Sequence, residues 1–120
     1  ESELITKYLE MSLQPECEGA IDQIINEAIV SERHESPVKL NLDKLKKYSD
    51  EFKDIVKSEF DNVLDLLNFS HQGYKIFKKW YIMGRLYYHI MVDQEHPEEG
   101  IQELRYVDPR RIRKIKEVRK

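Results

Sequence analysis

The chain has 120 residues, of which 40% are hydrophobic and 36% are charged, and its net charge is −3. This length fits one domain with a real core, and the composition excludes a disordered protein. No apolar run reaches the roughly 18 residues of a membrane helix, and no signal peptide precedes the first helix. The single cysteine, Cys17, excludes an internal disulfide and points to a reducing compartment.

Charge is shared unevenly along the chain. Residues 1–60 carry a net charge of −6 and residues 61–120 carry +3, and seven of the last eleven residues are Lys or Arg. This polarity favours a partner surface of opposite sign, for example on a second copy of the chain. Because the first residue is Glu rather than Met, we expect residues 1–120 to be one fragment of a longer protein.

Helical spacing predicts two helices before residue 30. Ser2 is available to cap the first, and Pro15 breaks the pattern and can begin the second. One apolar stripe of the second helix holds Cys17, Ile21, Ile24, Ile25, Ala28 and Ile29. Residues 31–37 form a predicted polar connector. The alternation of Val38, Leu40 and Leu42 with polar residues then predicts a short isolated strand.

Two further helices are predicted in the middle of the chain. Ser49 can cap the third, with Asp50 and Glu51 at the positive end of its dipole. Its predicted buried stripe contains Phe52, Ile55, Val56, Phe60, Val63, Leu64 and Leu67. After a turn at residues 68–70, the fourth helix is expected from Gly73 to Gly84, where a glycine with positive φ often ends a helix.

The period then changes from helical to two, which predicts an antiparallel hairpin from residues 85–92 and 101–107. Leu104 and Tyr106 can join the apolar face of the first strand, while Glu103 and Arg105 share the other face. Asp108 can close a local turn, and Pro109 ends the ladder. The sequence thus predicts an α+β fold, with about four helices packed with a small antiparallel sheet of the hairpin and a basic terminal strand.

No pattern of residues indicates an active site, so we expect no enzyme, no cofactor and no metal. The four histidines are His34, His71, His89 and His96. Their spacing from one another and from Cys17 does not match that of metal ligands. Cys17 lies on an apolar stripe, where a small buried side chain is expected rather than a nucleophile. The glycines form no phosphate-binding loop, and no two carboxylates are paired as acid and base.

Two groups of residues leave alternatives open. The aromatic cluster contains Tyr74, Phe77, Trp80, Tyr81, Tyr87 and Tyr88. Its spacing favours core packing over a protein interface or a platform for stacking single-stranded bases. The basic end could bind nucleic acid, or it could be a solvated element whose apolar residues are Ile112, Ile115 and Val118.

Several sequence segments, in their order along the chain, resemble the portal vertex proteins of T-even-type tailed phages. These segments are EFDNVLDLLNF, GYKIFKKWYIMGRLYYHIMVD and GIQELRYVDPRRIRKIKEV. They are preceded by AIDQIINEAIV and then VKLNLD. The resemblance runs from about Glu18 to Val118. The family tends to carry Val-Asp where this chain has Ile82 and Met83. The most specific motif residues, expected to be structural, are Trp80, Tyr81, Gly84, Arg85, Leu86, Tyr87, Glu103, Leu104, Arg105, Asp108 and Pro109.

The resemblance implies a structural segment, from the wing region, of a dodecameric portal ring at a capsid vertex. Such a ring conducts double-stranded DNA and connects the head to the neck and tail. Its implied partners are other portal subunits, capsid shell and scaffold proteins, and, through other regions, the packaging motor and neck proteins. It implies a place in the virion, and in the host cytoplasm during assembly. Direct DNA contact by this piece is not expected. The expected contacts to subunits or partners are Arg110, Arg111, Arg113 and Lys114.

Overall fold

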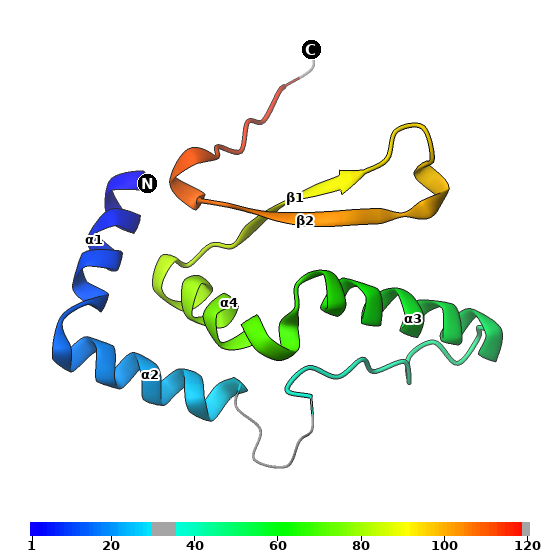
Figure 1. Cartoon of the computed structure of the whole chain (residues 1–120), viewed down its shortest axis with the longest axis horizontal. Coiled ribbons are helices and arrows are strands. Elements are labelled where there is room, and N and C mark those ends of the chain that lie inside the picture. The colour runs from blue at the N-terminus through cyan, green and yellow to red at the C-terminus, as the bar shows by residue number, and fades with distance from the viewer. Residues whose placement is uncertain (30–35, 119–120) are drawn as a thin grey trace.

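The computed structural model describes residues 1–29 and 36–118, and it confirms an α+β arrangement (Figure 1). Among these residues, four α-helices precede one two-stranded antiparallel sheet. The helices are α1 (Ser2–Ser12), α2 (Pro15–Ile29), α3 (Asp50–Leu66) and α4 (Phe69–Met83). The strands are β1 (Tyr87–Val92) and β2 (Ile101–Val107), and the short 3₁₀ helices η1 (Pro97–Glu99) and η2 (Pro109–Arg111) precede and follow β2.

The N-terminal helices pack on α4 around a very small core. Pro15 begins α2, as its missing N–H allows, whereas Glu1 rather than Ser2 takes the N-cap position of α1. The buried hydrophobic side chains of the described residues are Ile5, Ile25 and Met83, and Ile25 is fully buried. One hydrophobic side chain from each of α1, α2 and α4 is therefore buried in this layer.

The junction of α3 and α4 combines one expected cap with one unexpected turn. The Ser49 hydroxyl accepts the Phe52 N–H at 3.2 Å, which confirms the predicted cap of α3. Asn68 adopts a left-handed conformation with φ 48°, and with Leu67 it forms a short turn between α3 and α4. Consequently α4 begins at Phe69, four residues before the predicted start, and ends as expected at Gly84, whose φ is 73°.

The hairpin has the predicted alternation. Tyr88 lies opposite Tyr106 and Ile90 opposite Leu104, so the apolar residues of both strands share one face. The register shifts between Met91 and Val92, where the ladder is irregular. The connecting loop contains η1 and turns at Gly100, whose φ is 78°.

Two predicted strands are wrong. At Val38–Leu42, the Asn41 side chain accepts the Asp43 N–H at 2.9 Å, and the Leu45 N–H bonds the Leu42 carbonyl at 2.9 Å, so local turns replace the strand. Residues 112–118 have no ladder partner among the described residues, so the predicted basic terminal strand is absent there. The apolar residues of this segment recur every third position, which suits neither face of a strand.

The chain exposes much more surface than a compact protein of its mass. Its accessible surface is 10574 Å², whereas folded monomers of this mass expose about 6,900 Å². Its radius of gyration is 18.1 Å, whereas a compact domain of this length has about 13.6 Å. The predicted buried stripe of α3 is wrong in this respect, because no α3 residue is buried and Ile55 is 56% exposed.

Candidate functional site

The turn after β2 organises the basic end of the chain. Asp108 is the N-cap of η2, and its carboxylate accepts the Arg110 N–H at 2.9 Å. Pro109 follows as the first residue of η2 and is buried. The predicted turn at Asp108 is therefore confirmed, and it fixes the direction in which the basic residues leave the hairpin.

Arg110 is held inside the chain by two groups. Its Nε and Nη2 donate to the Asp108 carboxylate at 2.8 to 3.2 Å, and its Nη1 donates to the Thr6 hydroxyl at 3.3 Å. These charge-assisted bonds from the Arg110 guanidinium, together with its backbone N–H, lower the pKa of Asp108 to about 2. Arg110 thus ties η2 to α1, and its expected role as a contact to a partner stays a prediction.

Arg85 makes a second link to the start of α1. Its guanidinium forms an ion pair with Glu1 and donates to the Tyr87 hydroxyl at 3.3 Å. The Arg85 side chain is half exposed, so this link contributes little energy but orients the guanidinium. The N-terminus of α1, the start of β1 and η2 therefore meet at one corner of the molecule.

A cavity of about 430 Å³ opens at this corner. Arg113 and Lys114 line it together with Arg85, Arg110 and Ile112. Arg113 and Lys114 are exposed and make no hydrogen bond or ion pair within the described part of the chain. Arg111 is exposed and acts on Asp108 through its charge, which helps to lower the pKa of that carboxyl. These three cations, rather than Arg110, are available to an external group. The basic residues Arg119 and Lys120 lie outside the described residues.

The motif residues of the hairpin pair with one another. Arg105 Nε donates to Glu103 Oε1 at 3.0 Å, as their shared face of the strand allows. The Tyr106 ring meets Tyr88 edge-on at 6.0 Å between centroids, and Lys79 lies 4.0 Å above the Tyr106 centroid. Three other motif residues of the hairpin region are half-buried: Leu86, Tyr87 and Leu104.

The aromatic cluster is less buried than expected. Trp80 is 48% exposed and Tyr81 is 42% exposed, although Trp80 packs on Phe77 with ring centroids 5.5 Å apart. Core packing therefore holds for the half-buried Tyr74, Phe77, Tyr87 and Tyr88, but it is wrong for Trp80 and Tyr81. These two side chains remain open to an interface.

One polar cluster was missed by the sequence reasoning. Asp22 of α2 accepts the Tyr74 hydroxyl at 2.7 Å and the Lys78 ammonium at 2.9 Å, both from α4. The hydrogen bond from Lys78, followed by that from Tyr74, lowers the pKa of Asp22. Tyr74 and Lys78 stand at i and i+4, which places them on one helix face. Nothing in the sequence indicates a partner more than 50 residues away.

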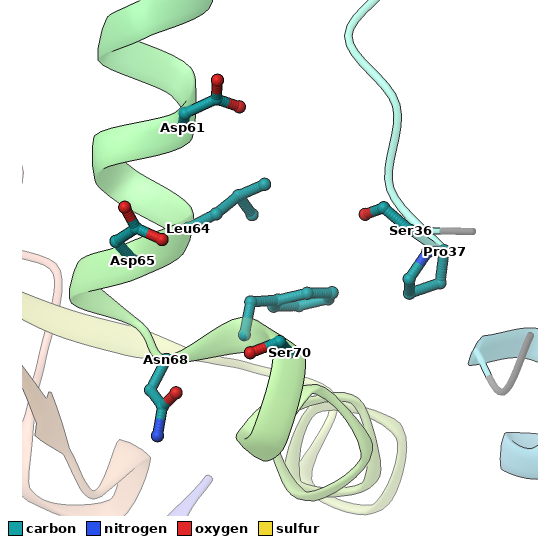
Figure 2. A pocket seen from close by; sticks show the side chains of 8 residues that line it. Ser36, Pro37, Asp61, Leu64, Asp65, Asn68 and Ser70 are labelled. Atoms are coloured by element: carbon teal, nitrogen blue, oxygen red, sulfur yellow. The ribbon is translucent and has the colours of Figure 1, made fainter. Parts of the chain in front are cut away.

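A hollow of about 760 Å³ lies between residues 36–37 and the corner of α3 and α4 (Figure 2). Figure 2 shows Leu64 pointing across it toward Pro37, while Asp61 and Asp65 stand along α3. The Asp61 and Asp65 side chains are exposed, and neither forms an ion pair with a described residue. Within residues 1–29 and 36–118, no three His, Cys, Asp or Glu side chains are grouped as metal ligands. His34 lies outside these residues.

Membrane insertion finds no support in the helices. In the described part of the chain, none of them is both long and apolar enough to cross a bilayer.

Comparison with known proteins identifies one group of relatives. The family described as "Bacteriophage T4-like portal protein (Gp20)" matches residues 1–120. The portal protein of Salmonella phage ViI is 37% identical over 112 residues, covering 93% of this chain and 20% of that protein. The portal protein of Vibrio phage KVP40 is 37% identical over 118 residues, covering 98% of this chain and 22% of that protein. The chain therefore spans about a fifth of the length of these curated relatives.

Proposed function

This chain belongs to the bacteriophage T4-like portal protein family, and on that premise we propose that it is a structural segment of a portal ring. In this role the chain is a passive building block, and it performs no bond chemistry itself. The ring would stand at a capsid vertex of the virion, conduct double-stranded DNA and join the head to the neck and tail. During assembly the subunits would be in the host cytoplasm.

The observation that carries this proposal is the large uncovered apolar surface. The chain exposes 10574 Å², roughly 3,700 Å² more than a compact monomer of its mass. Exposed hydrophobic side chains are present on every α-helix, including Leu4, Ile24, Phe52 and Trp80. An excess of exposed surface that includes this many hydrophobic side chains marks contacts with other protein, because water does not favour the exposure of apolar groups. A segment packed within a subunit and between subunits provides such contacts.

We place this segment in the wing region, outward from the channel. The resemblance of the hairpin sequence to that of the portal family supports this position. Because residues 1–60 are acidic, they are not favoured as the lining of a channel for DNA. In this position Arg111, Arg113 and Lys114 would meet acidic surface on a neighbouring portal subunit, or on shell or scaffold protein. The packaging motor and neck proteins would contact other regions of the ring.

Charge reversal in the complete gene product tests this role. Replacing Arg111, Arg113 and Lys114 by Glu should reduce ring assembly, measured by mass photometry, because each cation lacks an ion-pair partner among the described residues. Arg110 is kept, since Asp108 and Thr6 hold it. The matched control replaces Lys44, Lys46 and Lys47, which are also exposed, and changes the net charge equally. Equal assembly of both variants would contradict the assigned contacts.

A titration with duplex DNA separates this role from a nucleic-acid-binding module. If Arg111, Arg113 and Lys114 each neutralised one phosphate, log affinity would fall with log salt with a slope of about −3. The proposed function expects no tight, steeply salt-dependent binding by this chain. A slope of that size, lost in the charge-reversed variant, would favour the nucleic-acid-binding module instead.

A further inference from the structure

An apolar groove lies where α1, α2 and α4 meet. Its volume is about 200 Å³. The residues that line it include Tyr8, Met11, Cys17, Ile21, Tyr81 and Ile82. Tyr8 is 46% exposed, Met11 is 58% exposed and Tyr81 is 42% exposed, so the groove is open to a side chain from outside. We call it the α1–α2 groove.

Two of the three helices around the α1–α2 groove, α1 and α2, are strongly acidic, whereas α4 carries lysines. Residues 1–29 contain seven Asp or Glu and one Lys. Glu10, Glu16 and Glu18 are exposed and are sequence neighbours of the lining residues. An occupant of this groove should therefore combine aliphatic side chains with positive charge, because both features of the surface then find a complement.

The C-terminal segment, residues 111–118, has this chemistry. It contains four Lys or Arg and one Glu. Ile115 is 81% exposed and Val118 is 88% exposed. Residues 112–118 make no hydrogen bond with the described part of the chain, so their backbone groups are also available to a partner. The C-terminal segment therefore has aliphatic side chains, cations and backbone groups that no described residue covers.

No residue of the C-terminal segment is among those that line the groove of its own chain. The contact between Arg110 and Thr6 anchors the start of the C-terminal segment beside the first half of α1. From there the segment runs away from α2, as Figure 1 shows by the red trace. The groove instead involves Met11 and Ser12, at the last turn of α1. The C-terminal segment thus runs away from the groove of its own chain.

We propose that the α1–α2 groove receives the C-terminal segment of a neighbouring copy of this chain. This inference rests on the proposed function in a ring, and it names the contact between consecutive subunits. Because the donor and acceptor surfaces differ, the contact is heterologous, and copies join head to tail until rotation closes the ring. Ile115 or Val118 enters the groove, while Arg113, Lys114 and Lys116 face the acidic helices.

Disulfide trapping tests the contact directly, because Cys17 lies in the groove. The complete gene product keeps Cys17, has every other cysteine replaced by Ser, and carries Ile115→Cys. Oxidation should produce a ladder of dimers, trimers and larger species on a non-reducing gel, and a reductant should remove it. Ser58→Cys is the matched control, since Ser58 is exposed on α3, away from both surfaces. Neither this control nor the additional change Cys17→Ser should give a ladder.

The outcomes separate the inference from the proposed function. Rings without a ladder would overturn the inference and leave the portal role intact. A disulfide within one chain, or dimers alone, would also overturn it, because the contact would then be internal or two-fold. An equal ladder from Ser58→Cys would show unspecific crosslinking and overturn it as well. If the unmodified gene product forms no ring, the proposed function fails. The inferred contact is then judged by crosslinking alone: a ladder of disulfide-linked species supports it, and no ladder contradicts it.

Discussion

The ion pair between Asp108 and Arg110 makes a quantitative prediction about stability and pH. Lowering the pKa of Asp108 from 3.8 to about 2 corresponds to at most about 2.5 kcal/mol at pH 7. The Arg110 side chain is 38% exposed and that of Asp108 is 29% exposed, so solvent screening reduces this to about 1 to 2 kcal/mol. Asp108→Asn removes the charge, while its amide oxygen can still accept the Arg110 N–H.

The sign follows from the direction of the shift. The folded-state pKa is depressed, so the contribution is complete above the unfolded-state pKa and is mostly lost when the pH falls to 2. The free energy of unfolding of Asp108→Asn should therefore be about 1 to 2 kcal/mol lower than that of the unmodified chain at pH 7. The two values should converge near pH 2. Urea unfolding followed by circular dichroism between pH 7 and pH 2 measures both.

Asp93 offers a control with the same local geometry. Its carboxylate accepts the Glu95 N–H at 2.9 Å, as that of Asp108 accepts the Arg110 N–H, but no cation of the described residues pairs with it. Asp93→Asn removes no ion pair within the described residues, so it should lower the free energy of unfolding at pH 7 less than Asp108→Asn does. If Asp93→Asn and Asp108→Asn showed the same pH dependence, the guanidinium of Arg110 would not be the cause. A carboxyl-carbon NMR titration of Asp108 reads the pKa directly.

Three further predictions concern the packing of the helices. Ile25→Ala should lower the free energy of unfolding by about 2 to 5 kcal/mol, because Ile25 is fully buried. Ile24→Ala should lower it much less, because the Ile24 side chain is 42% exposed. Urea unfolding of the two variants measures the difference. Gly84→Ala should lower the free energy of unfolding by about 1 to 2 kcal/mol, because the φ of Gly84 is 73°. Gly19→Ala should stabilise α2, because an added Cβ meets nothing within 4 Å. The melting temperature should therefore fall in the first variant and rise in the second. Tyr74→Phe should raise the pKa of Asp22, and Tyr81→Phe should not, as carboxyl NMR would show.

The local features of the fold could be predicted from the sequence because short-range chemistry determines them. Ser49 caps α3, Gly84 ends α4 with positive φ, and the hairpin alternates as its period requires. The failures have a different cause. At Asn41 a side chain to backbone hydrogen bond competed with the expected strand, and at Asn68 a left-handed residue replaced a longer turn.

The candidate site was harder to predict, because tertiary contacts determine which cations are available. Sequence reasoning treated Arg110 like Arg111, Arg113 and Lys114. The structure places Arg110 against Thr6, 104 positions away, and this contact has no local signal. The cluster of Asp22, Tyr74 and Lys78 was missed for the same reason. Helical periodicity located the apolar residues, but it does not tell which of them the same chain covers, and Ile24 of α2 and Ile55 of α3 are exposed.

The amount of uncovered surface indicates how many neighbours this segment needs. A stable interface of standard size covers about 800 Å² on each partner. The excess over a compact monomer, roughly 3,700 Å², is several times larger, so one docked C-terminal segment does not account for it. The helix α3 exposes Phe52 and Ile55, and it lies on the other side of the molecule from α1 (Figure 1). We therefore expect other protein to cover α3, while the basic segment joins neighbouring copies. Charge reversal at residues 111–114 should then prevent rings without unfolding the subunit.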